Sequence, residues 1–223
     1  MMSELTSILR EPVEAVDLPG NVKVTRDDWL KAAMDILVSE GVEQVKVLTI
    51  SERLGVSRSS FYWYFKSRRT LLDNLLDDWE RTNTSLLVSH CEMPADTITE
   101  AVCHFFRCFI DPELFDQRLD FAVREWARND GTVRSRIDRA DKRRLSAIAT
   151  MFARHGYGEY EADVRARILY FMQLGYHALD HSEPMEERIS RLEGYLLGFT
   201  GREALPAEVE AMRAFARHNL GKP

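Results

Sequence analysis

Two helix-start signals of the same spacing constrain the first third of the chain more than any other feature. Thr25 stands three residues before Asp28, the spacing of a capping box, in which two side chains bond the first backbone amides of one helix. Thr49 and Glu52 repeat this spacing. Gly55 follows soon after and indicates where the second, short helix ends. The segment is therefore predicted to consist of closely spaced helices.

A third helix is predicted over residues 57–65, with Ser57 as its cap. Phe61 and Phe65 are four residues apart, so their rings share one face of that helix, and we expect both to be buried. Three helices within about fifty residues, the last two joined by a very short turn, form a helix-turn-helix pattern.

The rest of the chain also follows helical spacing. From residue 70 to residue 90, leucines and Trp79 recur on one side of a long amphipathic helix. The only strand candidate is the short run of residues 42–50. Further helices are expected over residues 96–110, 112–129, 132–155, 160–181, 185–200 and 206–218. The predicted fold class is all-α.

The charge of the chain is unevenly distributed. The 223 residues carry a net charge of −6, which alone argues against nucleic acid as a partner. Residues 22–70, however, hold nine Lys or Arg against six Asp or Glu. Between Val56 and Leu72 there are four basic residues and no acidic one. A basic segment on an acidic body suits a protein that contacts phosphates at one end only.

Composition favours an ordinary soluble protein of the cytoplasm. With 45% hydrophobic and 30% charged residues the chain can bury a sizeable core, and no apolar run is long enough to cross a membrane. The three cysteines have no close pairs, which fits reduced thiols. Residues 1–21 lack both a basic leader and an apolar core, so they are interpreted as a mobile arm rather than a secretory signal.

The helix of residues 57–65 is the candidate DNA-reading element, because the second helix of such a motif enters the major groove. With both phenylalanines turned inward, Arg58 lies on the outer side, where it suits a bidentate contact with guanine. Hydroxyls and amides at the helix starts suit phosphates. The alternative is that the cap, the aromatics and the cations are only structural. The predicted DNA-contacting residues are Thr49, Ser57, Arg58, Ser59, Ser60, Tyr62, Trp63, Tyr64 and Lys66.

The stretch LTISERLGVSRSSFYWYFKSRRTLLDNLL resembles the DNA-binding domain of the TetR family of bacterial transcription regulators. The resemblance covers about residues 25–76. It implies an all-helical homodimer, with an N-terminal domain that reads DNA and a larger C-terminal domain for ligand binding and dimerisation. It also implies a repressor of a pseudo-palindromic operator that a small-molecule inducer releases. The chain departs from the family at Tyr64, where His is usual.

The resemblance divides the chain into an arm (residues 1–21), a helix-turn-helix domain (22–68) and a helical ligand-binding and dimerisation domain (69–223). Two helices of this last domain carry apolar residues on two sides. We expect one side to pack in the core and the other against a second subunit. The alternative is that both are central helices of a monomer core. The predicted dimer interface comprises Ile168, Phe171, Gly175, Leu192, Leu196 and Phe199.

Nothing in the sequence identifies the inducer. Aromatic residues with a few polar groups among them are typical of a small-molecule pocket, although an ordinary core has the same composition. The predicted pocket consists of Phe105, Phe109, Phe121, Arg124, Trp126, Tyr170, Gln173 and His177.

Other functions are less favoured. His177 and His181 have the spacing of metal ligands but no evident third ligand, so no metal or other cofactor is predicted. The basic run of residues 139–144 is interpreted as a solvated face. No catalytic residue is predicted, since the chain lacks G-x-S-x-G, H-E-x-x-H and a phosphate-binding glycine loop. The alternative to a regulator is a helical adaptor that binds protein, and an enzyme is less favoured still.

Overall fold

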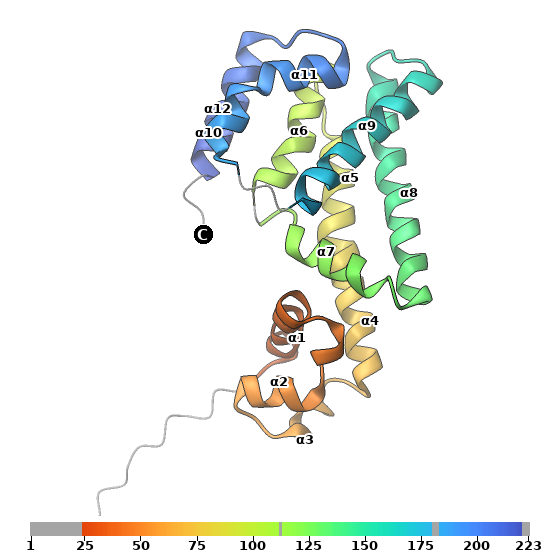
Figure 1. The fold of residues 1–223 in the computed structure, drawn as a ribbon, viewed down its shortest axis with the longest axis vertical. Coiled ribbons are helices and arrows are strands. Elements are labelled where there is room, and N and C mark those ends of the chain that lie inside the picture. The colour runs from red at the N-terminus through yellow and green to blue at the C-terminus, as the bar shows by residue number, and fades with distance from the viewer. Residues whose placement is uncertain (1–23, 112, 180–182, 220–223) are drawn as a thin grey trace, which may run out of the picture.

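The computed structural model describes residues 24–111, 113–179 and 183–219, and every regular element among them is a helix (Figure 1). The all-α prediction is confirmed. None of the described helices is long and apolar enough to cross a membrane. The predicted arm, residues 1–21, lies outside the described residues. The elements are α1 (Arg26–Glu40), η1 (Val42–Gln44), α2 (Val47–Leu54), α3 (Arg58–Phe61), α4 (Arg68–Trp79), η2 (Glu80–Thr84), α5 (Ser85–Glu92), α6 (Ile98–Ile110), α7 (Gln117–Trp126), α8 (Gly131–Arg154), α9 (Glu159–Ala178), α10 (Met185–Ser190), α11 (Leu192–Thr200) and α12 (Pro206–Asn219).

The first capping box forms as predicted and opens α1. The Thr25 hydroxyl accepts a hydrogen bond from the Asp28 amide at 3.2 Å, and the Asp28 carboxylate accepts one from the Thr25 amide at 2.7 Å. The helix ends at Gly41, whose φ of +83° favours glycine. The residues that α1 buries are Trp29, Leu30, Ala32, Ala33, Ile36 and Leu37.

The second predicted box does not form, and residues 42–50, the one weak strand candidate, are not a strand. Residues 42–50 make the short turn η1 and the first half of α2. α2 begins at Val47, two residues before Thr49, with Lys46 at the cap position and no side-chain cap bond. Val45 is fully buried just before this start, so packing rather than capping sets where the helix begins.

A single rod leads from α1–α3, together called the head, into the rest of the molecule. α4 and α5 lie end to end in Figure 1 and are joined by the π-helical segment η2. The long helix predicted over residues 70–90 is thus present, but it contains one wide turn. Arg68 fixes the start of the rod to the head, because its guanidinium donates to the carbonyls of Val45 at 2.5 Å and Val42 at 2.6 Å.

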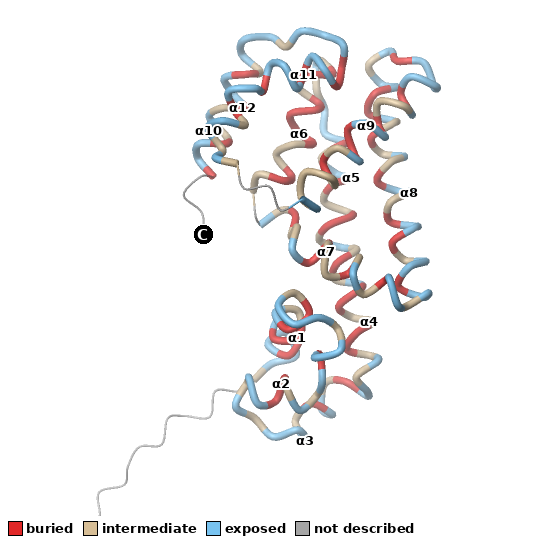
Figure 2. Tube along the Cα trace, in the orientation of Figure 1, coloured by how far each residue is buried: buried red, intermediate tan, exposed pale blue. Residues whose placement is uncertain are grey.

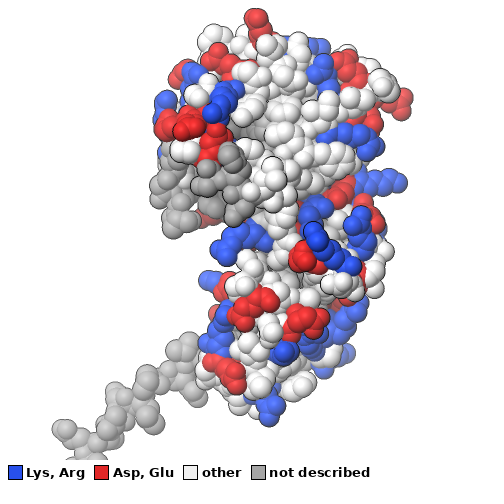
Figure 3. Space-filling view, viewed as in Figure 1, with Lys and Arg blue, Asp and Glu red and all other residues white. Residues whose placement is uncertain are grey.

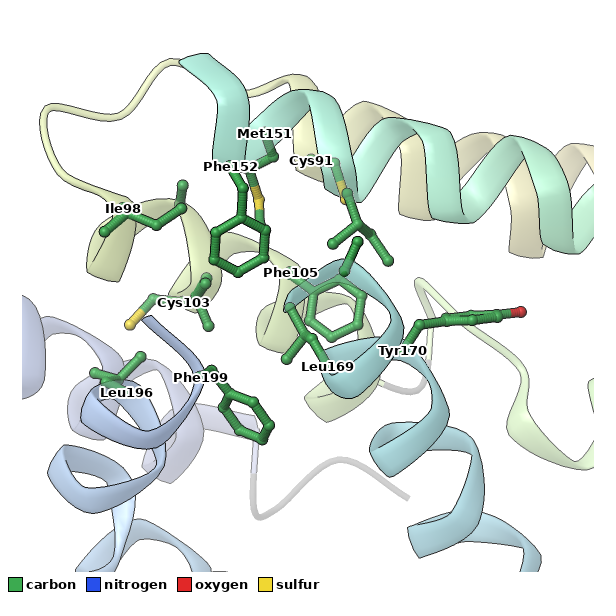
Figure 4. Packing of buried hydrophobic residues seen from close by; sticks show 14 of the residues in the cluster. Cys91, Ile98, Cys103, Phe105, Met151, Phe152, Leu169, Tyr170, Leu196 and Phe199 are labelled. Carbon is green, nitrogen blue, oxygen red and sulfur yellow. The ribbon is translucent and has the colours of Figure 1, made fainter. Parts of the chain in front are cut away.

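Two apolar cores lie along this rod. The first, the junction core, joins the head and α4 to α7 and the first half of α8. The second, the body core, joins α5 to α6, the second half of α8, α9, α11 and α12. Because Phe61 of the head shares the junction core with Leu119 and Ile137, packing continues across the predicted domain limit at residues 68–69, which stays a prediction. Figure 4 shows Tyr170 at the edge of the body core with its hydroxyl pointing away.

A buried ionic cluster connects the two cores. Arg144 on α8 is fully buried and donates to Asp120 at 2.9 Å, to the Thr84 hydroxyl at 3.1 Å and to the Tyr170 hydroxyl at 3.2 Å. Asp120 also accepts from the indole of Trp79 at 2.8 Å. Trp79 belongs to the junction core and Tyr170 to the body core. The cluster therefore takes polar groups from α4, η2, α7, α8 and α9.

Arg124 of α7 completes the cluster. It donates to Asp120 at 2.9 Å and to the two carboxylate oxygens of Asp141 at 2.6 and 3.0 Å, and the Tyr170 hydroxyl donates to Asp141 at 2.6 Å. Burial would raise the pKa of Asp120, but the charges and hydrogen bonds of Arg144 and Arg124 outweigh burial and lower that pKa to about 2. Asp120 is therefore ionised inside the protein.

Two C-terminal helices differ from prediction. α7 begins at Gln117 rather than residue 112, because the Asp116 carboxylate accepts from the Leu119 amide at 2.9 Å and caps the helix there. The helix predicted over residues 185–200 is interrupted at Arg191 and forms α10 and α11. The interruption coincides with ion pairs from the Arg191 guanidinium back to two glutamates before it.

Replacing Arg144 with alanine should lower the free energy of unfolding by about 3–5 kcal/mol, because it leaves the Asp120 carboxylate buried without its fully buried partner. The matched control is Arg134→Ala on the same helix, whose exposed pair with Asp138 should contribute less than about 1 kcal/mol. Urea unfolding followed by circular dichroism measures both. Equal losses in the two variants would contradict a structural role for the cluster.

The cluster also predicts a pH dependence of stability. The pKa of Asp120 is about 2 in the folded protein, lower than the value of about 3.9 for an Asp in an unfolded chain. Its contribution of about 2–3 kcal/mol is complete above about pH 5 and is lost as the pH falls toward the folded pKa. Asp120→Asn should lack this part of the acid loss, whereas Asp138→Asn should keep it. Urea unfolding at a series of pH values checks this, and parallel curves for wild type and Asp120→Asn would refute it.

Candidate nucleic-acid interface

α3 is a short helix anchored by two phenylalanines. It spans Arg58–Phe61 and continues as a tight turn to Phe65, not as one regular helix over residues 57–65. Phe61 and Phe65 are both buried, as expected, and their rings stack with centroids 5.3 Å apart. Phe61 also meets Trp29 of α1 edge to face, with a centroid distance of 5.3 Å. These aromatic contacts hold the segment on the head.

The other side of this segment is exposed. Trp63 is 79% exposed and Tyr62 is 63% exposed, which is unusual for such large apolar side chains. Arg58, Ser59 and Lys66 are exposed beside them. Figure 2 shows α3 at the end of the molecule farthest from α11, with much of its trace exposed. The structure thus gathers predicted DNA-contacting side chains on a surface that another molecule can cover.

Gly55 sets the angle between α2 and α3. Its φ of +66° ends α2, the Val56 amide donates back to the Ser51 carbonyl at 3.0 Å, and the Gly55 amide donates to the Glu52 carbonyl at 3.2 Å. These two bonds form a Schellman motif, which favours glycine at the left-handed position. The chain therefore reverses within a few residues, and α3 packs against α2 as a helix-turn-helix requires.

The hydroxyl residues around this turn bond mainly to one another. Ser57 is the N-cap residue of α3 but makes no side-chain cap bond, and its hydroxyl pairs with that of Ser59 at 2.8 Å. The Ser60 hydroxyl donates to the Ser57 carbonyl at 2.7 Å. Thr49 lies in the first turn of α2 and is half-buried. Contact of these hydroxyls with DNA stays a prediction.

Tyr64 differs most from its predicted role. We expected its hydroxyl to face a phosphate, but the hydroxyl donates to the Val24 carbonyl at 2.8 Å, and the ring packs against the junction core. Residues 61–65 are all aromatic and cannot all point inward on a regular helix, so an outer position was expected for Tyr64. The tight turn after α3 removes that restriction. Tyr64 therefore holds Val24, two residues before the start of α1, against the segment that follows α3.

Lys46 is an exposed cation that is not among the predicted DNA-contacting residues. It occupies the cap position of α2, and its ammonium group bonds the Gln44 side chain at 3.3 Å. The first helix of a helix-turn-helix crosses the DNA backbone, so a cation at its start suits a phosphate. Lys46 was missed because the spacing of Thr49 and Glu52 predicts a helix that starts at Thr49, whereas α2 starts at Val47, directly after Lys46.

Five of the eight predicted pocket residues, Tyr170 among them, lie inside or beside the body core. Phe105 and Phe109 are core residues, and the His177 ring stacks on Phe109 with centroids 5.7 Å apart while bonding Gln173. Burial, followed by the charge of Arg188, lowers the pKa of His177 to about 4, so its imidazole is neutral at neutral pH.

Tyr170 and the remaining three predicted pocket residues do not face a space shared with that group. Arg124 and Tyr170 belong to the ionic cluster, where their polar groups are bonded to each other and to carboxylates, so they do not serve as free ligand anchors. Phe121 and Trp126 line a cleft of about 830 Å³ between the head, the start of α4 and α7. The structure therefore does not bring the predicted set around one cavity.

The predicted dimer residues divide between surface and core. On α9, Ile168 is 53% exposed, Phe171 is 50% exposed, and Gly175 is half-buried. The side of α11 that we assigned to a second subunit packs instead in the chain's own body core, because α6 and α9 already cover it. The exposed large hydrophobic residues of α11 are Tyr195 and Leu197. The buried residues of the predicted interface are Leu192, Leu196 and Phe199.

Of the two candidate metal ligands, the structure describes His177. Within residues 24–111, 113–179 and 183–219, no three His, Cys, Asp or Glu side chains are close enough together to hold a metal ion. His181 lies outside these ranges. The three cysteines are free thiols, and burial raises the pKa of each.

The N-terminal part of the chain matches known regulators. Residues 30–75 match the model of the bacterial regulatory proteins of the tetR family. The tetracycline repressor protein class C of Escherichia coli is 36% identical over 55 residues, which cover 25% of each chain. The class A repressor from transposon 1721 in Escherichia coli is 40% identical over 55 residues, 25% of this chain and 26% of the relative. The match thus spans about a quarter of the length of these curated relatives.

Solved structures share the fold over most of the chain. A TetR-family transcriptional regulator from Marinobacter aquaeolei VT8 has a TM-score of 0.60 and 17% identity, covering 88% of this chain and 98% of the other. AmtR of Mycobacterium smegmatis has a TM-score of 0.57 and 20% identity, covering 93% and 99%. At these identities the likeness shows the fold alone.

Proposed function

We propose a function for this chain from its family and its exposed surface. The N-terminal match and the curated relatives assign the chain to the tetR family of bacterial regulatory proteins, and its fold agrees with that family. It is a helix-turn-helix transcriptional regulator, and the proposal is that it acts as a repressor in the cytoplasm. A homodimer binds a pseudo-palindromic operator in double-stranded DNA and leaves it when a small-molecule inducer binds. The observation that carries the proposal is the exposed side of α3, which the buried pair of Phe61 and Phe65 holds outward.

In the proposed complex α3 enters the major groove and Arg58 reads one base. Its exposed guanidinium can donate two hydrogen bonds to a guanine, which no other exposed side chain of α3 can do. Ser59 offers an adaptable hydroxyl beside it. Tyr62 and Trp63 present apolar ring surface suited to a thymine methyl group.

Phosphate contacts come from the edges of the same surface. Lys66 follows α3 and its turn, Lys46 occupies the cap position of α2, and both are exposed. Cations at the two ends of the motif fit the DNA backbone on either side of the groove. Thr49 and Ser57 are the proposed hydroxyl donors between them.

We place the dimer interface on the exposed apolar side of α9 and α11. Dimeric helix-turn-helix proteins read two half-sites about one helical turn apart, so two heads must be held at a fixed distance. Ile168, Phe171 and Leu197 leave a set of apolar side chains uncovered within one subunit, with Gly175 and Gly198 beside them on the same helices. Small residues next to exposed apolar ones allow two such faces to approach closely.

The cleft between the head and α7 is the proposed place for the inducer. Its volume of about 830 Å³ falls in the range of small-molecule sites. Its lining includes Phe121 and Trp126 as apolar walls and Arg118 as an exposed cation. A molecule bound there would touch both the head and the body, and so could change how one is held against the other.

The upstream region of the chain's own gene should bind the protein, and binding should weaken steeply as salt rises, because each contacted phosphate releases counterions. Lys66→Ala should reduce the slope of log affinity against log salt by about one. Arg58→Ala should cost about 1–3 kcal/mol and relax specificity at one base position. Fluorescence anisotropy with labelled duplexes measures both effects.

The control for these variants is Arg134→Ala, which removes an exposed cation on α8, outside the head. It should leave both the slope and the specificity unchanged. Absence of binding to the upstream fragment at low salt would reject the regulator and favour the protein-binding adaptor. Equal loss on all sequences in Arg58→Ala would show that this residue contacts only phosphate.

Phe171→Glu should convert the dimer into a monomer, because it places a charge in the proposed interface. The single subunit should still fold, because the Phe171 side chain is already 50% exposed in it. Sedimentation equilibrium gives the mass, and circular dichroism shows whether the fold is kept. Leu205→Glu, at an apolar residue that is 55% exposed between α11 and α12, is the control and should remain dimeric. An unchanged dimer in Phe171→Glu would move the interface elsewhere.

A further inference from the structure

A basic groove runs between α5 and α8, on elements that do not belong to the head. Its volume is about 590 Å³. Val88 and Ala147 contribute apolar surface, and Ser146 and Thr150 contribute hydroxyls. Glu92 is the only acidic residue of its lining. The cations that line it, called the groove cations, are Arg139, Lys142, Arg143 and Arg154.

None of the groove cations has a carboxylate within ion-pair distance among the described residues. Most of the other arginines among the described residues do have one. The two nearest acidic residues in the sequence are already bound elsewhere. Asp138 pairs with Arg134 at 3.0 Å, and Asp141 pairs with Arg124 at 2.6 Å. The positive charge of the groove is therefore not neutralised by its own helix.

This arrangement is unfavourable for the isolated chain. Arg139 and Arg143 are four residues apart on α8, and Lys142 is three residues from Arg139, so like charges are neighbours on one helix face. The rest of the chain is acidic, with a net charge of −6 overall. In Figure 3 basic side chains project at the edge of the molecule where α8 runs. An anionic occupant would remove the repulsion.

We propose that this groove binds an acidic, extended segment of a partner protein. Arg139 and Arg154 are separated by fifteen helical steps, or about 22 Å along α8. An extended chain of about seven residues covers that length, with side chains pointing alternately to two sides. Carboxylates on one side meet the groove cations, and small apolar side chains meet Val88 and Ala147.

Other anions fit the groove less well. Bound single-stranded nucleic acid relies on aromatic side chains for base stacking, and no aromatic residue lines this groove. A duplex is wider than the space between two packed helices. A compact anion such as citrate would reach only part of a row of cations about 22 Å long.

The groove also connects to the rod that carries the head. Arg143 donates to the Ser85 hydroxyl at 3.4 Å, at the first residue after η2. Arg154 donates to the carbonyls of Cys91 and Glu92 at the other end of α5. An acidic segment that draws these two arginines toward itself would compete with both contacts and so act on α5.

The test uses the full chain and a fluorescein-labelled peptide of about seven residues in which glutamate alternates with alanine and valine. Anisotropy should show saturable binding that weakens with salt, and the peptide with glutamine in place of glutamate should not bind. Arg139→Glu combined with Arg143→Glu should weaken binding about tenfold or more, because two attractions become repulsions. Arg139→Gln combined with Arg143→Gln should give an intermediate loss of peptide affinity. This milder variant keeps the test valid if the double glutamate variant does not fold.

Arg134→Glu is the matched control, since it reverses an exposed charge on the same helix outside the groove, and it should change affinity by less than about twofold. Equal weakening by Arg134→Glu, or no saturable binding by wild type, overturns the proposal. The proposal is also overturned if polyphosphate or duplex DNA displaces the peptide when the competitor supplies a lower concentration of negative charge than the peptide does. That result would favour a phosphate ligand. The assay needs no operator, so it stands or falls independently of repressor function.

Discussion

The fully buried pair of Arg144 and Asp120 is the interaction on which the arrangement of the central helices depends. Apolar packing brings helices together but allows them to slide, whereas hydrogen bonds between buried charges require fixed distances and directions. Here such bonds link α8 to α7, to Thr84 of η2 and to Tyr170 of α9, and Trp79 adds α4. The rod that carries the head and the helix with the exposed apolar face are thus held in one frame.

The head follows the opposite principle. Its reading surface is held almost entirely by aromatic packing behind it, through Phe61, Phe65 and Trp29, while Trp63 and Tyr62 are left in water. A short helix whose apolar contacts are all on one side does not need the side chains of its other side for packing. Side chains there can be selected for what they contact in a partner molecule rather than for stability.

The sequence predicts this fold well where local chemistry decides it, and less well where distant residues do. The Thr25 box, the burial of Phe61 and Phe65 and the reversal at Gly55 depend on neighbours in the chain, and all are present. The false box at Thr49 shows that burial of a preceding residue can override a capping signal.

The candidate sites show the same limit. Arg124 looks like a ligand anchor in sequence, but its partner Asp141 lies on another helix and cannot be recognised from spacing. Likewise, the apolar pattern of residues 192–199 does not reveal which side the body core uses, because that choice depends on α6 and α9. Exposed side chains of α3 were easier to predict, since only one face of so short a segment can be buried.

The π-helical segment Glu80–Thr84 has a consequence for the whole rod. Before it, the rod contributes Leu75, Leu76 and Trp79 to the junction core, and after it, Leu87 and Cys91 to the body core. The wide turn offsets the angular register between these two sets. If the same five residues were wound at ordinary α-helical pitch, α5 would be rotated by about 100° about its axis, and Leu87 and Cys91 would turn toward solvent. Removing one residue together with the wide turn would cancel this rotation, so the pitch of this segment and its number of residues are coupled.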